Sequence, residues 1–415
     1  MRTFIYFYHY YLFHFLLYRC CGFFFVPLFI RHKVSSIYEY LDIRFNLSMR
    51  RLGTILFAGY AIGWMGSMLF GMGLIVQAVL GLTGTQLTWM LIGIGLFALL
   101  YTTLGGVQAV IWNDVLQTII FGVGMLIVLF LTIGRIEGGW STVFQFGLEH
   151  DKFQMFNMDF SLFERRNFYT ACAFALFMYL PGYTVSQTTA QRYVCMSSLG
   201  EARRALLISS LVSTSVCLLF FLVGTSMFTF YHQPGAGGFP ELFRQDQLLP
   251  YFVGTEIRLS GLIGLLIAGL FAATMSTIDS GINSMTAVVV YDWLPGRKVS
   301  LGLSRLICCF IGLFVIAAAL IAPYLGEHLI EIISKIAGTF LGLLLGIFLL
   351  GMFASGANTA GTFIGFLGGV VALIIVWTQT TLPHWWYGGV TVFTTVGLGV
   401  LANSDSEPLK TIHQG

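Results

Sequence analysis

The chain has 415 residues, of which 57% are hydrophobic, 16% aromatic and 9% charged. A soluble globular protein carries about a quarter charged residues, so this composition excludes a body folded in water. Cytosolic enzymes, nucleic-acid-binding proteins and disulfide-rich secreted modules are excluded with it. The formal net charge is only +3, so we expect no polyanionic partner and no nucleic acid. The expected surroundings are the lipid bilayer.

Long apolar runs divide the chain into predicted membrane spans. A bilayer core about 30 Å thick needs roughly 20 apolar residues per helix. The runs here are continuous, whereas a β-barrel shows short alternating segments. We therefore expect an all-α membrane protein, because a helix satisfies its own backbone hydrogen bonds in lipid. About eleven spans are predicted, at residues 4–30, 53–80, 87–104, 107–133, 168–188, 205–231, 261–290, 301–322, 329–354, 361–378 and 385–402.

The connections between spans predict the orientation of the chain. Lys and Arg are more frequent in the connections on one side, and cytoplasmic connections carry the basic excess. This places the amino terminus outside and the carboxyl terminus in the cytoplasm of a multi-pass protein of the plasma membrane. The triplet Asn46-Leu47-Ser48 then lies on the cytoplasmic side, where we expect it to carry no glycan. The predicted organisation is an atypical hydrophobic amino terminus at 1–22, a multi-span domain at 23–402 and a short cytoplasmic tail at 403–415.

The main polar cluster within a span lies in the seventh. Ala273, Ser276, Thr277 and Ser280 share one helix face, because positions i, i+3, i+4 and i+7 lie above one another. Asp279 is predicted to fall close to the same stripe. A carbonyl, hydroxyls and a carboxylate are the oxygen ligands that a hard cation prefers, and polar groups in lipid are costly without a role. The alternative is that the hydroxyls bond to carbonyls one turn earlier or join neighbouring helices.

The fifth span contains the sequence Tyr179-Leu180-Pro181-Gly182-Tyr183-Thr184-Val185-Ser186-Gln187. Proline followed by glycine at mid-membrane predicts a broken helix, which frees backbone groups to line a cavity. Broken helices near the midplane are typical of secondary transporters. A simple kink without a ligand is the alternative.

Three charged residues in or near spans have simpler explanations. Glu331 and Lys335 are four residues apart, so an ion pair along one helix accounts for both. Asp114 lies near the cytoplasmic end of the fourth span, where an aspartate usually caps a helix while reaching toward water or takes part in a salt bridge.

Four segments together resemble the sodium:solute symporter family, whose members include sodium-coupled sugar, monocarboxylate, vitamin, sialic acid and iodide transporters. The segments have the order and spacing of the family, and the resemblance covers roughly residues 23–402. It is specific to the family and does not identify a substrate. The four segments are residues 36–45, 101–117, 187–193 and 272–284.

The resemblance implies an inverted-repeat (5+5 helix, LeuT-like) transporter fold, with substrate and sodium between the first helices of the two repeats. It implies one sodium site at Ala273, Ser276 and Thr277. It implies a second at Asp114 with Asp279 and Ser280, where an aspartate at 279 departs from the hydroxyl that the family pattern carries. The implied substrate contacts in the broken fifth span are Tyr179, Ser186 and Gln187.

The resemblance also implies two spans ahead of the one that ends near residue 30. Residues 1–22 are a Phe-, Tyr- and His-rich run without likeness to the family. The first repeat is therefore expected to lack its first helix, and we expect an amino-terminally truncated product. Sequencing the 5′ end of the transcript would test this expectation.

The predicted function is sodium:solute symport, in which the sodium gradient drives co-transport of a small organic solute or anion. The predicted partners are the sodium ion, a small-molecule solute and the lipid bilayer. Sodium serves as the coupling ion, and we expect neither an organic cofactor nor an enzymatic activity. The alternative is a transport-incompetent truncated membrane protein that binds solute or associates with an intact transporter. A channel is disfavoured, because the oxygen cluster lies on one helix and does not form a ring.

Overall fold

The computed structural model describes residues 25–27, 35–104, 107–153, 157–163, 167–194, 196, 198–234, 238–241, 247–257 and 261–403. Within these residues all regular structure is helical, which confirms the predicted all-α class. Short π-helical turns, at Ala175–Tyr179, Val253–Ile257 and Val289–Trp293, extend three of the helices. The α-helices are α2 (Glu39–Arg44), α3 (Leu47–Leu80), α4 (Gly84–Leu104), α5 (Val107–Ile133), α6 (Gly139–Glu149), α7 (Phe168–Phe174), α8 (Leu180–Thr184), α9 (Gln187–Val194), α10 (Leu199–Tyr231), α11 (Leu248–Phe252), α12 (Leu262–Val288), α13 (Leu301–Ile321), α14 (Leu329–Phe353), α15 (Thr359–Gln379) and α16 (Tyr387–Leu401).

The helices agree with a multi-pass membrane protein. Seven of those in the described part of the chain are long and apolar enough to cross a bilayer, and α7 to α9 add an eighth if this bent pair counts as one span. Helices α4 and α16 occupy two further predicted spans. The first predicted span, residues 4–30, lies almost entirely outside the described residues. The total of eleven therefore stays a prediction.

Short polar side chains set the starts of the long helices. Asn46 caps α3 by accepting a hydrogen bond from the backbone N–H of Met49 at 3.0 Å. Such caps satisfy backbone donors that a first helical turn leaves unpaired. Glycine at 81 then ends α3 in the left-handed region, at φ 64°. The same capping role is taken by Asn167, Ser198, Ser300 and Asn358.

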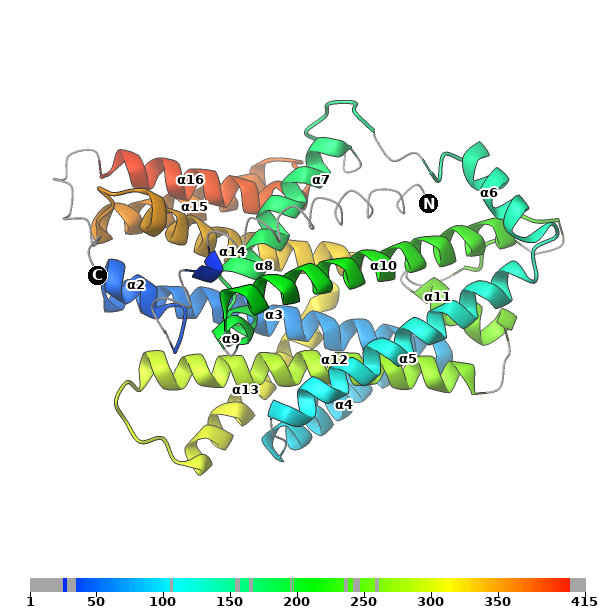
Figure 1. The fold of residues 1–415 in the computed structure, drawn as a ribbon, viewed down its shortest axis with the longest axis horizontal. Helices are drawn as coiled ribbons and strands as arrows, with labels where there is room; N and C mark the ends of the chain where they lie inside the picture. Colours follow the sequence, from blue (N-terminus) through cyan, green and yellow to red (C-terminus); the bar gives the residue numbers. More distant parts are fainter. Residues whose placement is uncertain are drawn as a thin grey trace.

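Helix α3 is the element against which the site is built. It packs against α12, α13 and α14. Figure 1 shows α3 and α12 running lengthwise, with the segment α7 to α9 crossing them steeply. The contacts of α3 with α12 run antiparallel, because Arg50 meets Asp292 while Met65 lies against Gly281.

Burial distinguishes the central helices from the outer ones. In the most apolar 18-residue stretch of α14, 72% is buried inside the protein, whereas in that of α10 only 17% is buried. The outer face of α10 exposes Leu207, Ile208 and Leu211. Exposed apolar faces of this extent on long helices fit contact with lipid, which supports the conclusion drawn from composition.

The predicted ion pair at the start of α14 is present. Lys335 Nζ lies 2.9 Å from Glu331 Oε1, four residues earlier. Lys335 also donates to the Leu325 carbonyl at 2.6 Å. Both charges are therefore accounted for by local structure, as the spacing predicted.

A glycine permits close packing between α15 and α16. A Cβ at Gly365 would meet the Thr395 carbonyl oxygen and come within 2.9 Å of both Cα and N of Gly399. Because these are backbone atoms, Gly365→Ala is expected to push the helices apart and destabilise the protein by about 1–3 kcal/mol. The measurement is thermal unfolding in detergent. Gly397→Ala on α16 is the control, since nothing lies within 4 Å of its Cβ position, and it should leave stability unchanged or raised.

Candidate functional site

A cavity of about 370 Å³ opens between α3, the broken helix, α12 and α14. This volume is within the range of small-molecule sites. Its wall combines aromatic rings, hydroxyl groups, one guanidinium and the apolar side chains of two alanines and two methionines. The lining residues are Tyr60, Ala61, Trp64 and Met65 of α3; Met178, Tyr179, Gly182, Tyr183, Ser186, Thr188, Thr189 and Arg192 of the broken helix; Ser276, Thr277, Ser280 and Gly281 of α12; and Ala337 of α14.

Three of the predicted sodium ligands lie together on the α12 wall of this cavity: Ser276, Thr277 and Ser280. Thr277 Oγ1 donates to the Ala273 carbonyl at 3.0 Å, so this hydroxyl makes the back-bond to the preceding turn. A carbonyl oxygen has two lone pairs and a hydroxyl oxygen keeps acceptor capacity while donating. The back-bond therefore leaves oxygen lone pairs at both Ala273 and Thr277. Ala273 itself does not line the cavity.

Asp279 does not line the cavity. The residue is 1% exposed, and its carboxylate accepts a hydrogen bond from Thr102 Oγ1 of α4. At 3.6 residues per turn, Asp279 lies about 60° around the helix from Ser276, about 100° from Ser280 and about 160° from Thr277. It therefore lies at the edge of the predicted stripe and contacts α4, whereas the three hydroxyl-bearing residues line the cavity. Asp114 lies on α5, but its side chain is outside the described part of the structure.

The fifth predicted span is broken, although four residues later than Pro181-Gly182 indicated. The π-helical turn Ala175–Tyr179 precedes the proline, which then occupies the first turn of α8. Helix α8 continues directly from the π-helical turn, and helices deform at proline and at π-helical turns. The helix ends at Thr184 and resumes at Gln187 with a bend of 55°. Tyr179 and Ser186 line the cavity on either side of α8.

Gln187 does not line the cavity and instead binds the segment ahead of α2. Its Oε1 accepts from the Ile37 backbone N–H at 2.9 Å, and its Nε2 donates to the Ser35 carbonyl at 3.3 Å. The neighbouring Tyr38 hydroxyl donates to the Val185 carbonyl at 3.1 Å. Burial raises the pKa of Tyr38 well above its usual range, so the hydroxyl keeps the proton that it donates. These bonds hold the break between α8 and α9 in place.

Removal of the Tyr38 hydroxyl should measure this support. Tyr38→Phe leaves the Val185 carbonyl without its donor in a buried position, so we expect a loss of about 1–2 kcal/mol of stability. Thermal unfolding in detergent is the measurement. Tyr231→Phe is the matched control, because the Tyr231 hydroxyl is buried without a hydrogen-bond partner among the described residues. Equal losses in the two variants would contradict a supporting role for Tyr38.

A buried ionic network lies beyond the cavity, and the sequence did not indicate it. Asp292 is fully buried, and its Oδ1 lies 2.8 Å from Arg50 Nε. Its Oδ2 accepts from the hydroxyls of Ser36 and Thr54, each at 2.9 Å. Arg50 also pairs with Asp42 at 3.2 Å. The predicted topology placed Asp292 and Arg50 in separate cytoplasmic connections, and 242 residues of sequence separate the pair, so no local pattern could join them.

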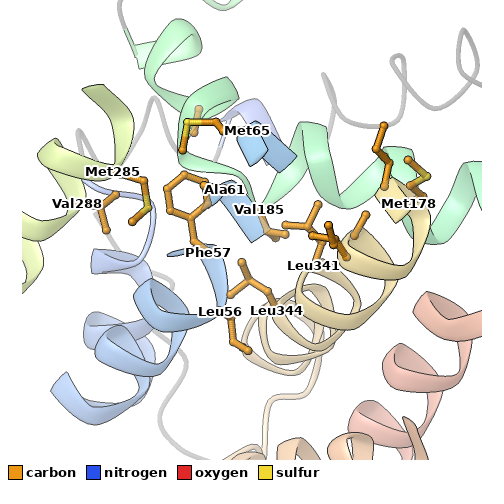
Figure 2. Close-up of a cluster of buried hydrophobic side chains, with 14 of the residues drawn as sticks. Leu56, Phe57, Ala61, Met65, Met178, Val185, Met285, Val288, Leu341 and Leu344 are labelled. Atoms are coloured by element: carbon orange, nitrogen blue, oxygen red, sulfur yellow. The ribbon is translucent and has the colours of Figure 1, made fainter. Parts of the chain in front are cut away.

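An apolar layer separates the cavity from this network. Along α3, Arg50 and Thr54 belong to the network, Phe57 follows, and Met65 lines the cavity. Helix α12 runs in the opposite direction, so along it the cavity comes first and the network last. Figure 2 shows the side chains of Phe57, Met285 and Val288 gathered at this level, with Val185 of the break nearby. Phe57 and Val185 are 0% exposed. The end of the cavity nearest Arg50 is therefore closed twice, first by apolar packing and then by the ionic network.

The comparisons with known proteins agree with this architecture. The family model of the sodium:solute symporter family matches residues 5–369. The sodium-dependent multivitamin transporter of Oryctolagus cuniculus is 32% identical over 385 residues, which cover 91% of this chain and 58% of that protein. The sodium/sialic acid symporter NanT of Aliivibrio fischeri is 27% identical over 386 residues, which cover 91% of this chain and 75% of that protein. The chain thus spans little more than half the length of the first of these relatives.

A solved structure is also similar. It is the substrate-bound outward-open state of a Na⁺-coupled sialic acid symporter, with a TM-score of 0.85 and 25% sequence identity. The match covers 97% of this chain and 84% of that one. Such a likeness over nearly the whole chain supports the predicted LeuT-like architecture. The family and these relatives are transporters, not enzymes. Since the family model matches most of its length, this chain belongs to the sodium:solute symporter family.

Proposed function

We propose that this chain is a secondary active transporter that couples inward movement of a small solute to the sodium gradient. The observation that carries the proposal is the meeting of three hydroxyl-bearing residues on α12, Ser276, Thr277 and Ser280, with Tyr179 and Ser186 of the broken helix in one cavity. Oxygen ligands on one wall suit sodium, and mixed aromatic and hydroxyl groups on the other suit a polar solute. The relatives named above are sodium-coupled, which supports the same conclusion.

The coupling follows from binding energies alone. External sodium binds at Ser276 and Thr277 with the Ala273 carbonyl, and this binding stabilises the state whose cavity faces outward. Solute then binds beside the broken helix. Because both ligands stabilise the same state, each raises the affinity for the other, and the two effects are equal because coupling between sites is reciprocal. Transition to the inward-facing state requires that the apolar layer and the Arg50–Asp292 network open, after which the low cytoplasmic sodium concentration favours release.

The topology is part of the proposal. The amino terminus faces outward and the carboxyl terminus the cytoplasm of the plasma membrane, so the Arg50–Asp292 network lies at the cytoplasmic end of the cavity. The basic residues Arg44 and Arg51 beside it favour that side. We propose that Asp114, Asp279 and Ser280 contribute to a second cation site, and that Gln187 acts on the solute through the position of the break.

Uptake by the full chain in proteoliposomes tests the function. The probes are radiolabelled sialic acid, lactate and iodide, each assayed with an inward sodium gradient and with potassium in its place. We expect accumulation of at least one probe above equilibrium only with the sodium gradient. Binding without accumulation would instead support the transport-incompetent alternative. A flux indifferent to the gradient would indicate a channel and overturn the proposal.

A further inference from the structure

Helices α6 and α10 end in the same way. The C-cap residue is His150 in α6 and His232 in α10. His150 Nδ1 lies 3.0 Å from the carbonyl oxygen of Phe146, one turn earlier in α6. His232 Nδ1 lies 2.8 Å from the carbonyl oxygen of Phe228, one turn earlier in α10. Each imidazole also packs against the ring of the phenylalanine that it caps, with centroid distances of 3.9 Å in α6 and 4.1 Å in α10.

The two helix ends meet in one cluster of four rings. The imidazole centroids of His150 and His232 are 6.0 Å apart, and the ring centroids of Phe146 and Phe228 are 5.9 Å apart. Figure 1 shows α6 beside this end of α10. Both imidazoles are exposed, whereas Phe228 is buried beneath them. The histidines belong to different connections of the chain, so no spacing in the sequence indicates that they are neighbours.

The helix carbonyls determine which nitrogen of each imidazole is free. A carbonyl oxygen accepts a hydrogen bond but cannot donate one, so Nδ1 carries the hydrogen in both His150 and His232. In a neutral imidazole the lone pair then lies on Nε2. Neither Nε2 atom has a hydrogen-bond partner among the described residues. Metal-binding histidines usually make this same Nδ1–H contact to a backbone carbonyl, because it orients the ring and sets the tautomer.

The spacing of the two rings suits a shared zinc ion. Zinc binds a histidine nitrogen at about 2.0–2.1 Å, which places two imidazole centroids about 5 Å apart at a tetrahedral angle. The observed 6.0 Å is about 1 Å longer, a difference that small rotations of two exposed side chains can close. Among the described residues, no third His, Cys, Asp or Glu joins the pair as a metal ligand. Water would therefore complete the coordination.

The electrostatics of the helix ends allow a cation of moderate affinity. The carboxyl end of a helix carries partial negative charge, and here two such ends meet, which favours a positive ion. Lys152 opposes it, because its Nζ lies 3.6 Å from the centroid of Phe228 and brings one positive charge close to the rings. With two protein ligands and this charge nearby, we expect zinc to bind in the micromolar range.

We propose that His150 and His232 form a binding site for zinc or a similar divalent transition-metal ion, separate from the cavity and from the sodium ligands. Imidazole nitrogen prefers zinc, nickel and copper, whereas magnesium and calcium prefer oxygen. A bound ion would join the end of α6 to the end of α10. In the proposed topology both ends face outward, so the ion would come from the external solution. The site does not depend on the proposed symport.

Equilibrium binding of ⁶⁵Zn²⁺ to the purified full chain in detergent tests the site, with a purification tag that contains no histidine. His150→Gln and His232→Gln should each weaken zinc binding about tenfold or more. Glutamine can still donate to the helix carbonyl but is a poor zinc ligand, so each cap is kept while the metal ligand is lost. Excess Ni²⁺ should displace the bound zinc, and excess Mg²⁺ should not.

His328→Gln is the matched control. His328 precedes α14, and its side chain makes no capping hydrogen bond there, so zinc affinity should stay within about twofold of the natural chain. Zinc should also protect His150 and His232 of the natural chain, but not His328, from modification by diethylpyrocarbonate, a measurement that needs no variant to fold. Absence of zinc binding by the natural chain, binding retained in both glutamine variants, or equal protection of all three histidines would overturn the inference.

Discussion

Asp292→Asn is expected to lower the free energy of unfolding by about 3 kcal/mol. Asp292 is fully buried and accepts from Arg50, Ser36 and Thr54. The amide removes the negative charge while the Arg50 guanidinium stays buried, at 9% exposure. Removing one partner of a buried ion pair costs far more stability than replacing both partners by apolar residues, because the remaining charge is left poorly solvated.

Two comparisons separate this cause from a general loss of packing. Asp42 pairs with the same guanidinium, but its side chain is 34% exposed. Asp42→Asn should therefore cost less than about 1 kcal/mol, as expected for a partly solvated pair. The double variant Arg50→Met with Asp292→Asn should recover at least half of the loss, since no unpaired charge remains. Thermal unfolding in detergent measures the natural chain, these three variants and Arg50→Met alone, which completes the double-mutant cycle. Additive losses in the double variant would show that the ion pair is not the source of the effect.

Local patterns predicted the parts of this molecule that depend on one helix. The apolar runs predicted the positions of the spans, because in lipid each helix must satisfy the hydrogen bonds of its own backbone. Ser276, Thr277 and Ser280 were predicted to share a surface, and they do. That prediction needed only the helical repeat. Glu331 and Lys335 were paired on the same grounds, and their ion pair is confirmed.

The contacts that side chains make with a second, distant element were not predicted. Asp279 turns to Thr102 of α4, and nothing in the sequence around either residue indicates that contact. Gln187 lies next to the cavity-lining Ser186 but is held by the backbone of Ser35 and Ile37. The break after Thr184 follows from the same contacts, because Tyr38 holds the Val185 carbonyl outside the helical ladder. Proline alone predicted a break too early, since a π-helical turn accommodates it.

The double variant Ser276→Ala with Thr277→Ala is expected to weaken sodium binding by about two orders of magnitude. Each substitution removes one oxygen from the wall of the cavity, and a hydrogen-bonding or ion-dipole contact to a charged group contributes about 1.5–3 kcal/mol. Each single variant should therefore lose roughly tenfold or more in sodium affinity. Equilibrium ²²Na⁺ binding measures the affinity, and sodium-dependent uptake of the accumulated probe should require correspondingly more external sodium.

Thr274→Ala is the matched control for this prediction. Thr274 lies on the same helix and is buried, at 6% exposure, but it does not line the cavity. The Thr274→Ala variant loses one hydroxyl but no proposed sodium ligand, so its sodium affinity should stay within about twofold of that of the natural chain. If the double variant keeps its sodium affinity, the ion does not bind on this face of α12. If Thr274→Ala loses as much as the double variant, the effect comes from the helix as a whole. Only a loss confined to the cavity face assigns sodium to Ser276 and Thr277.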